Sequence, residues 1–284
     1  VKQFIELGIE LHVLIGNHDT YYKNTNDVNS VAELFGDRYE QIHIYPEAET
    51  VLFDDTPILF VPWINNENHA NTLTMIENTN AQVCMGHLEV AGFAMAKGLI
   101  NEHGINKSIF GKFDTVFSGH FHHKSDDGHI FYLGAPYEFY WSDCDDRKGF
   151  HVFDTKTREL ERIINPLTIH SKVYYDDTQN DYTKYDVSKH KSNYVKVIVV
   201  NKKDLYQFDQ FIDRILKADC HEVKIIEDFS DLDANTVSDD IVENTQDTMT
   251  LLGKYIEELD TTLDKGRLIN LQRQLYTEAQ DLEL

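Results

Sequence analysis

The chain has 284 residues, with 26 lysines and arginines against 49 aspartates and glutamates, which gives a formal net charge of −23. Its hydrophobic content of 41% and charged content of 26% are ordinary for a globular protein and exclude a wholly disordered or collagen-like chain. A charge of −23 repels nucleic-acid phosphates. A protein of this composition that handles DNA therefore needs positive charge from metal ions or from a partner.

The sequence shows no pattern typical of export or membrane insertion. No apolar run approaches the roughly 20 residues of a membrane span, and we expect no secretory signal. The cysteines Cys84, Cys144 and Cys220 are far apart and form no Cys-x-x-Cys pair. We therefore expect a cytoplasmic protein with neither a disulfide framework nor a thiolate zinc site.

The hydrophobic pattern predicts a mixture of strands and helices over the first 165 residues. A helix end at residues 4–9 leads into a short apolar strand at residues 11–15, which a polar loop follows. Further strands are predicted at residues 42–45, 51–53, 58–63, 82–85, 115–117, 130–133, 149–153 and 159–164, and a helix at 72–78. The last three strands alternate like antiparallel strands joined by turns.

Pro166 marks the predicted start of a second part of the chain. A polar stretch at residues 174–193 precedes a strand at 194–200, a helix at 205–217 and a strand at 222–226, which together form a β-α-β unit. Residues 227–243 are acidic and are interpreted as a linker. The last segment is predicted to be helical, with two apolar stripes: Leu252, Tyr255, Ile256 and Leu259, then Leu268, Leu271, Leu275 and Leu282.

Three of the predicted buried strands end in a glycine that an asparagine or histidine follows. The turns are Gly16-Asn17-His18-Asp19, Gly86-His87 and Gly119-His120-Phe121-His122. Ligand-binding loops gather at the carboxyl ends of strands in α/β sheets, and glycine lets the backbone turn sharply there. Imidazole and amide-oxygen ligands suit divalent metals such as Mn, Fe and Zn. Most of the other histidines, His12 and His43 among them, are interpreted as ordinary surface or structural residues.

These turns resemble the third, fourth and fifth signature blocks of the calcineurin-like metallophosphoesterases. Within that superfamily the chain most resembles the SbcD/Mre-eleven-type DNA exonuclease subunit, in the form carried by large tailed phages. The similarity to the phage form rests on Val61-Pro62-Trp63, residues 86–93, residues 118–122, Tyr132-Leu133-Gly134-Ala135-Pro136, Arg147-Lys148-Gly149-Phe150 and Val152-Phe153-Asp154. The resemblance implies an α/β fold: a four-layer α/β/β/α sandwich at residues 1–165, lacking its first strands, a small α/β capping and DNA-binding domain at 166–230, and a linker and helical C-terminal arm at 231–284.

The resemblance also implies a role for each residue of the three turns. Asn17, through its amide oxygen, would ligate one divalent ion together with His87 and His120, and His122 would ligate a second ion. The expected ions are two Mn²⁺, with Mg²⁺ as the alternative. His18 is not a ligand in this family and would be the catalytic residue that faces the substrate phosphate. Asp19 is a candidate for the group that fixes an imidazole's tautomer.

The chain departs from the family pattern at its beginning. The first two blocks, Asp-x-His and Gly-Asp-x-x-Asp, are expected upstream of Gly16, where this chain has 15 residues. Three segments match those blocks in part but follow the third block, so we interpret them as coincidental: Asp127-Gly128-His129, Asp219-Cys220-His221 and Gly36-Asp37-Arg38-Tyr39-Glu40. The second ion would then keep only His122, and we expect the chain as written to hold two metals weakly.

The function that the resemblance implies is a metal-dependent DNA exo/endonuclease subunit in recombination and double-strand-break repair. It further implies that the C-terminal helices bind an SbcC/Rad-fifty-type ATPase, that the protein dimerises, and that it works in the host cytoplasm without a membrane. Two alternatives stay open: a phosphodiesterase or phosphatase with a non-DNA substrate, and an inactive docking subunit. The helical arm could also pack on the second domain. Residues 137–141, four of which are aromatic, are expected to pack in a core rather than to stack on DNA.

Overall fold

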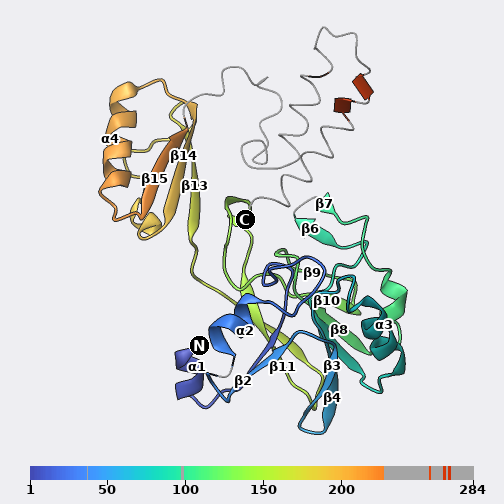
Figure 1. Ribbon diagram of the computed structural model, residues 1–284. Helices are drawn as coiled ribbons and strands as arrows, with labels where there is room; N and C mark the ends of the chain where they lie inside the picture. The colour runs from blue at the N-terminus through green and yellow to red at the C-terminus, as the bar shows by residue number, and fades with distance from the viewer. Residues whose placement is uncertain (37, 97–98, 227–255, 257–264, 267, 270–284) are drawn as a thin grey trace. The chain divides into compact units, whose positions relative to one another are not determined.

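The computed structural model describes residues 1–36, 38–96, 99–226, 256, 265–266 and 268–269. Helices and strands are mixed along the chain, which confirms the expected α/β class (Figure 1). The chain forms two compact units, one of residues 1–139 and 145–168, and one of residues 140–144 and 169 onward. The acidic linker and helical arm fall almost wholly outside the described residues and stay predictions. No helix in the described part of the chain combines the length and the apolar character needed to cross a membrane.

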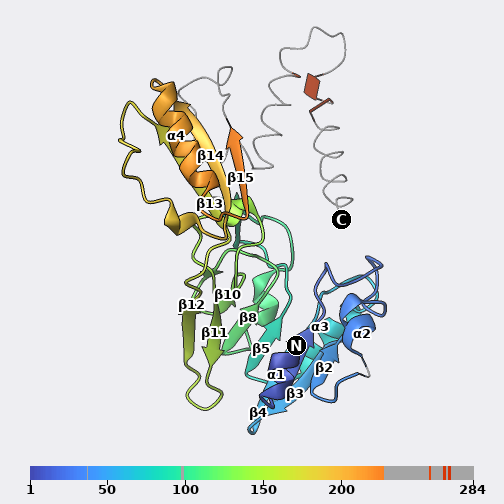
Figure 2. The same ribbon diagram turned by 90° about the vertical axis from the view of Figure 1, so that its left-hand side faces the viewer.

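The first unit is built on a six-stranded sheet with the order β3-β4-β5-β8-β10-β9 (Figures 1 and 2). The strands are β3 (Glu49–Phe53), β4 (Thr56–Val61), β5 (Val83–Gly86), β8 (Thr115–Ser118), β9 (Ser125–Asp126) and β10 (Ile130–Tyr132). β4, β5, β8 and β10 are parallel, whereas β3 and β9 pair antiparallel at the two edges. The central strands are continuous apolar runs because both faces of the sheet are covered.

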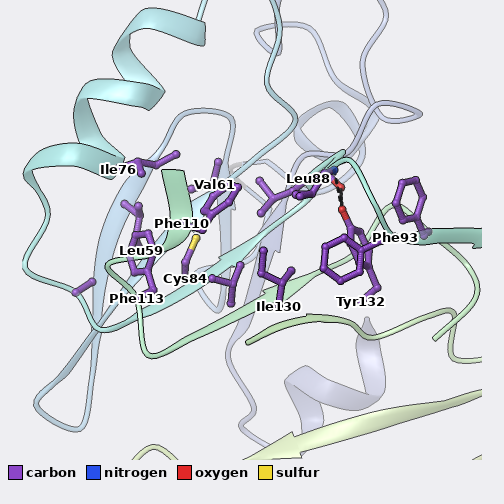
Figure 3. Close-up of a cluster of buried hydrophobic side chains, with 14 residues drawn as sticks. Leu59, Val61, Ile76, Cys84, Leu88, Phe93, Phe110, Phe113, Ile130 and Tyr132 are labelled. Atoms are coloured by element: carbon purple, nitrogen blue, oxygen red, sulfur yellow. Dashed lines mark hydrogen bonds between the residues drawn. The ribbon is translucent and has the colours of Figure 1, made fainter. Parts of the chain in front are cut away.

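One face of this sheet packs against helix α3 (His69–Asn78) and the short 3-10 helix η1 (Lys107–Phe110). Alternate residues of a strand point to opposite faces, so Leu59 and Val61 lie on this side whereas Ile58 and Phe60 lie on the other. Figure 3 shows the first of these two clusters. Its members are Leu59, Val61, Ile76, Ala81, Cys84, Leu88, Val90, Phe93, Phe110, Phe113, Val116, Phe121, Ile130 and Tyr132.

The opposite face of the sheet packs against two pairs of strands. β1 (Leu11–Leu14) and β2 (Ile42–Tyr45) pair in parallel, and β11 (Gly149–Phe153) and β12 (Leu160–Ile164) pair antiparallel. Leu14 and Phe153 from these pairs reach the cluster formed by Ile58, Phe60 and Phe117. The arrangement therefore places a helical layer on one side of the central sheet and strands on the other.

Several elements of this unit were not predicted from the sequence. Helix α2 (Ser30–Phe35) begins after Asn29, whose side chain accepts a hydrogen bond from the amide of Ala32 at 2.7 Å. Such an N-cap stabilises a helix too short to be visible in the hydrophobic pattern. Helix α1 (Lys2–Glu6) lies slightly before the predicted helix end, and β6 (Ala94–Ala96) and β7 (Leu99–Ile100) form a small hairpin.

The second unit contains a three-stranded parallel sheet with the order β13-β14-β15. Its strands are β13 (His170–Asp176), β14 (Tyr194–Asn201) and β15 (Glu222–Ile226), and helix α4 (Leu205–Leu216) covers one face. Phe208, Phe211 and Ile215 of the helix are buried against alternate residues of the strands. β13 includes residues 174–176, the start of the stretch that was predicted to be polar and irregular. The predicted β-α-β unit therefore has an additional strand. Two 3-10 helices, η2 (Trp141–Asp143) and η3 (Ser188–His190), complete the unit.

Candidate metal centre

Three strands that lie apart in the sequence deliver their carboxyl ends to one place. β5 and β8 are parallel neighbours, with Gly86 in register with Ser118. The amide of Gly119 donates to the carbonyl of Gly86 at 2.9 Å, and the amide of Trp63 donates to the carbonyl of Ile15 at 2.7 Å. These bonds bring the turns that follow β1, β5 and β8 together, as the strand-end pattern predicted.

Asn17, His87 and His120 converge at this place. The Oδ1 atom of Asn17 lies 2.9 Å from Nε2 of His87 and 3.2 Å from Nδ1 of His120. The two imidazole rings are 5.2 Å apart between their centres. The structure thus brings together the three residues that the sequence analysis assigned to one ion, and each contributes a single nitrogen or oxygen atom to a common point.

His18 and His122 lie at the border of this cluster. Both imidazoles are close enough for their charge to lower the pKa values of His87 and His120. His18 is exposed, whereas His122 is half-buried with its ring 5.1 Å from that of Phe139. The structure therefore places His18 where a substrate in solution can reach it.

Burial keeps the two central imidazoles neutral. Burial, together with the nearby charges of His120, His18 and His122, lowers the pKa of His87 to about 3. The same two causes, burial first and then His18 and His122, lower the pKa of His120 to about 4. A neutral imidazole has a free lone pair, which is the form that binds a metal ion.

Glycine is required on both sides of the His87 imidazole. A Cβ atom added at Gly16 would lie 2.8 Å from Cε1 of His87, and one added at Gly119 would lie 3.2 Å from its Nδ1. Real Cβ contacts are longer than the first distance, so any other residue at position 16 displaces the ring. The two glycines in the sequence pattern therefore serve the packing of His87 as well as the turns themselves.

The turn at His120 is strained. His120 has a φ of 76°, a region that residues with a Cβ rarely adopt. The amide of Phe121 donates to the carbonyl of Gly119 at 3.1 Å, which closes a three-residue γ-turn centred on His120. Strain of this kind costs on the order of 1–3 kcal/mol and is typical of functional sites. Here it directs Nδ1 of His120 toward Asn17.

Two buried hydroxyl groups that sequence reasoning did not identify hold the turn of His87. The Ser118 Oγ accepts the amide of Leu88 at 3.0 Å. The hydroxyl of Tyr132 donates to the carbonyl of Leu88 at 2.9 Å and accepts the amide of Val90 at 2.8 Å (Figure 3). Their partners are 30 and 44 residues away in the sequence, so no local pattern could reveal them.

Hydrogen bonds from a buried lysine stabilise the loop that carries His122. Lys148, which is 3% exposed, donates from Nζ to the carbonyl of His122 at 2.9 Å and to Oδ2 of Asp146 at 2.8 Å. Asp146 also contacts Nδ1 of His123 at 3.1 Å. His123 therefore has a structural partner, in keeping with its interpretation as a structural residue.

Asp19 has a different partner from the one considered in the sequence analysis. Its Oδ2 accepts the amide of Gly16 at 2.8 Å, and within the described residues it forms no hydrogen bond with an imidazole. It therefore shapes the Gly16–Asp19 turn. Asp127, from one of the partial matches to the missing blocks, accepts the amides of His129 and Ile130 at 3.1 and 2.9 Å. That carboxylate closes a hairpin turn. This structural role agrees with the interpretation that the match of residues 127–129 to the Asp-x-His block is coincidental.

The expectation that residues 137–141 pack in a core is wrong for three of them. Tyr137, Phe139 and Tyr140 are 46%, 45% and 59% exposed. In the first unit, the rings of Tyr137 and Phe139 lie 4.6 Å apart, and Phe139 reaches the His122 ring. Trp63, on the loop after β4, also belongs to the site, since its ring lies 5.2 Å from that of His120.

The chemistry of the donor atoms fits a divalent cation. The amide oxygen of Asn17 lies 2.9 and 3.2 Å from the two neutral imidazole nitrogens, and neighbouring ligand atoms about 2.1 Å from one octahedral ion are separated by about 3 Å. An adjoining cavity of about 380 Å³ is lined mainly by apolar side chains such as Leu14, Met85 and Phe117 and does not suit a phosphate group.

Comparison with known proteins agrees with this geometry. No protein-family profile matches the chain. The chain is 33% identical over 283 residues to exonuclease subunit 1 of Enterobacteria phage T4, an alignment that covers 98% of this chain and 80% of the phage protein. The chain therefore belongs to the phage exonuclease subunit 1 family, which consists of SbcD/Mre-eleven-type recombination nucleases of the metallophosphoesterase type.

Proposed function

We propose that the protein is the metal-dependent nuclease subunit of a DNA exo/endonuclease that works in recombination and double-strand-break repair. The observation that carries the proposal is the convergence of Asn17, His87 and His120 from the ends of three strands. The membership of the exonuclease subunit 1 family supports a nuclease over other phosphoesterases.

Asn17, His87 and His120 would hold one divalent ion, and His122 would contribute to a second. Mn²⁺ suits a mixed imidazole and oxygen donor set, and Mg²⁺ is the alternative. When bound, such ions lower the pKa of a coordinated water and bind the phosphate oxygens. The neutral state of His87 and His120, which burial favours, keeps their lone pairs available.

His18 is the residue that we assign to the reacting phosphate. It follows Asn17 directly and is exposed, so its imidazole can contact a substrate while Asn17 keeps its contacts with His87 and His120. Its N–H group would donate a hydrogen bond to a phosphate oxygen, or its proton to the leaving oxygen. Stabilisation of developing charge by a positioned donor is the usual source of rate enhancement at such sites.

Both units offer groups that suit a DNA strand. In the second unit, Lys172, Lys196 and Lys224 lie in register on the three neighbouring strands of the sheet. Such a row supplies local positive charge for phosphates in a chain of net charge −23. In the first unit, the exposed rings of Tyr137 and Phe139 offer surfaces on which bases can stack.

The proposal extends to architecture and assembly. The first unit would belong to a four-layer α/β/β/α sandwich, which the helical layer and the strand pairs on opposite faces of its sheet support. The second unit would be the capping domain. The C-terminal helices would bind an SbcC/Rad-fifty-type ATPase, and the name of the phage T4 relative, a subunit, supports an assembly. A homodimer and a location in the bacterial host cytoplasm remain predictions.

The test is cleavage of linear DNA with Mn²⁺ by the chain extended with the expected upstream Asp-x-His and Gly-Asp-x-x-Asp blocks, alone and with an SbcC/Rad-fifty-type ATPase. We expect Mn²⁺-stimulated cleavage that His18→Ala reduces by about 10²–10⁴-fold, because it removes a group that acts on the reacting phosphate. His69→Ala is the matched control, since His69 is an exposed histidine of α3.

The open alternatives give other outcomes. Hydrolysis of an aryl phosphodiester without cleavage of DNA would favour a phosphodiesterase of different substrate class. Absence of any hydrolysis with Mn²⁺ or Mg²⁺, combined with tight binding to the ATPase, would identify a docking subunit. Normal DNA cleavage by His18→Ala would contradict the role of His18.

A further inference from the structure

A second group of potential metal ligands lies on the paired strands β1 and β2. Glu10 directly precedes β1, and His12 within β1 is in register with His43 of β2. Nε2 of His12 lies 3.7 Å from Oε2 of Glu10, and Nε2 of His43 lies 4.0 Å from the same oxygen. Among the described residues, this is the one group of three histidine, cysteine or acidic side chains whose ligand atoms all lie within 4.8 Å of one another.

The group is separate from the candidate metal centre. His12 lies within β1, whereas Asn17 lies in the turn at residues 17–19, beyond the end of that strand. Glu10 and His12 lie just before and at the start of β1, whereas Asn17 follows its end. An ion held by Glu10, His12 and His43 would therefore share no ligand with Asn17, His87 and His120.

The surroundings of His12 orient its imidazole for metal binding. Its Nδ1 is hydrogen-bonded to the hydroxyl of Tyr45 at 2.7 Å, so Nε2 is the nitrogen that faces Glu10. When Nδ1 donates this bond, Nε2 carries the lone pair. Histidine ligands in proteins commonly bond their second nitrogen to an oxygen in this way. The ring is further held edge-on against Phe53, with 4.8 Å between the ring centres.

The charge and mobility of the three side chains also suit an ion. Burial and the charge of His43 lower the pKa of His12, whereas Glu10 opposes the shift. The rings of His12 and His43 stack 4.6 Å apart with 20° between their planes, an arrangement that disfavours two imidazolium charges. The side chains of His43 and Glu10 are 40% and 67% exposed, so they can rotate to shorten the ligand separations, while His12 at 17% is fixed.

We propose that Glu10, His12 and His43 form a second divalent-metal site, of the zinc class, that fastens β1 to β2. Two imidazoles and one carboxylate are a common donor set for Zn²⁺, and the fourth position stays open to water. Three ligands from two hydrogen-bonded strands need little ordering when the ion binds. The ion would stabilise β1, which is the strand that leads to Asn17.

The test is a titration of the metal-free chain with Zn²⁺, in which thermal unfolding measures the Tm at each concentration. A parallel titration with Co²⁺ as a substitute ion measures visible absorption. Zn²⁺ is expected to raise the Tm of the parent chain, and Co²⁺ to give the strong absorption of a tetrahedral site. Both signals are expected to weaken in Glu10→Gln and His43→Gln, with an apparent Kd at least roughly tenfold higher. The exposed residues Glu33 and His69 provide the matched controls Glu33→Gln and His69→Gln.

The design separates this site from the candidate metal centre and from unfolding. Without Zn²⁺, the variants of the exposed Glu10 and the half-buried His43 are expected to keep the parent Tm. His87→Ala is expected to retain the ion that depends on His43. The proposal is overturned if Zn²⁺ does not stabilise the parent chain, if the stabilisation persists in Glu10→Gln and His43→Gln, or if only His87→Ala abolishes it.

Discussion

The Oδ1 atom of Asn17 lies 2.9 Å from Nε2 of His87, although the two residues are 70 positions apart in the chain. The contact exists because β1 and β5 end at the same place, with Asn17 three residues after the end of β1 and His87 directly after β5. His120 reaches the same oxygen from the end of β8. Three local sequence signals thus become one site only through the arrangement of the strands.

The fit of His87 between two glycines predicts the effect of a single methyl group. In Gly16→Ala, the added Cβ would lie 2.8 Å from the imidazole, so the ring must move away from Asn17. We expect the Mn²⁺ affinity to fall by about tenfold or more while the chain stays folded. Isothermal titration of Mn²⁺ measures the affinity. Gly111→Ala is the control, since Gly111 has a φ of −63° and lies away from the site; equal losses in both variants would contradict the explanation.

The positive φ of His120 predicts an unusual order of stability between two variants. Both His120→Ala and His120→Gly remove the imidazole, but only glycine adopts a φ of 76° without strain. We expect His120→Gly to be more stable than His120→Ala by about 1 kcal/mol in urea denaturation. At His69, in helix α3, the same pair is expected in the reverse order. The same order at both positions would argue against strain at His120.

The buried hydroxyl of Ser118 predicts a coupling between stability and the metal centre. Ser118→Ala leaves the buried amide of Leu88 without its acceptor, which costs about 1–3 kcal/mol. Since Leu88 follows His87, weaker Mn²⁺ binding is expected as well. Denaturation and metal titration on the same preparation measure both effects. Ser108→Ala, at an exposed serine, is expected to change neither. A loss of stability with unchanged Mn²⁺ binding would show that Ser118 does not position His87.

The row of lysines in the second unit predicts a pH-dependent stability. Burial lowers the pKa of Lys196 to about 8, and the charges of Lys224 and Lys172 add to the effect. Because the folded-state pKa is below the ordinary value of about 10.5, the unfolded chain binds more protons between these two values. The contribution of Lys196 to stability therefore increases as the pH rises from about 8 to 10.5, and its penalty is fully present below pH 8.

The matched comparison is Lys196→Met against the parent chain. The variant lacks the penalty, although it also loses the contact of Nζ with the Trp141 ring at 4.2 Å. Relative to the variant, the parent is expected to gain Tm as the pH is raised from 7 to 10. Lys217→Met, at an exposed lysine, should track the parent at every pH. A constant difference between Lys196→Met and the parent across this range would show that Lys196 titrates normally.

The parts of the fold that the sequence predicted well are those with a strong local signal. The strand predicted at residues 194–200 is β14 (Tyr194–Asn201), because its buried valines form a continuous apolar run. β13 was missed because only Val173 and Tyr175 are buried, between polar neighbours in a segment rich in Asp and Lys. Helix α2 was missed because it depends on the side chain of Asn29 rather than on a periodic apolar stripe.

The residues of the candidate site also divide into those with a local sequence signal and those without one. Asn17, His87 and His120 could be identified because each directly follows a glycine at a strand end. Ser118 and Tyr132 could not, because their hydrogen bonds with Leu88 connect different strands of the sheet. His12 and His43 looked ordinary in the sequence, since only the register of β1 with β2 makes them neighbours. The sequence thus identifies residues that carry their signal locally and misses those defined by pairing.

The most direct measurement is a titration of Mn²⁺ into the metal-free chain, with free Mn²⁺ read from its electron paramagnetic resonance signal. The parent chain is expected to remove Mn²⁺ from solution, and Asn17→Ala, His87→Ala and His120→Ala are each expected to weaken that binding by about tenfold or more. His43→Gln and His69→Ala should bind as the parent does. Mn²⁺ binding that keeps the parent affinity after the combined loss of Asn17, His87 and His120, in a chain that also carries His43→Gln, would contradict a metal centre at the three strand ends.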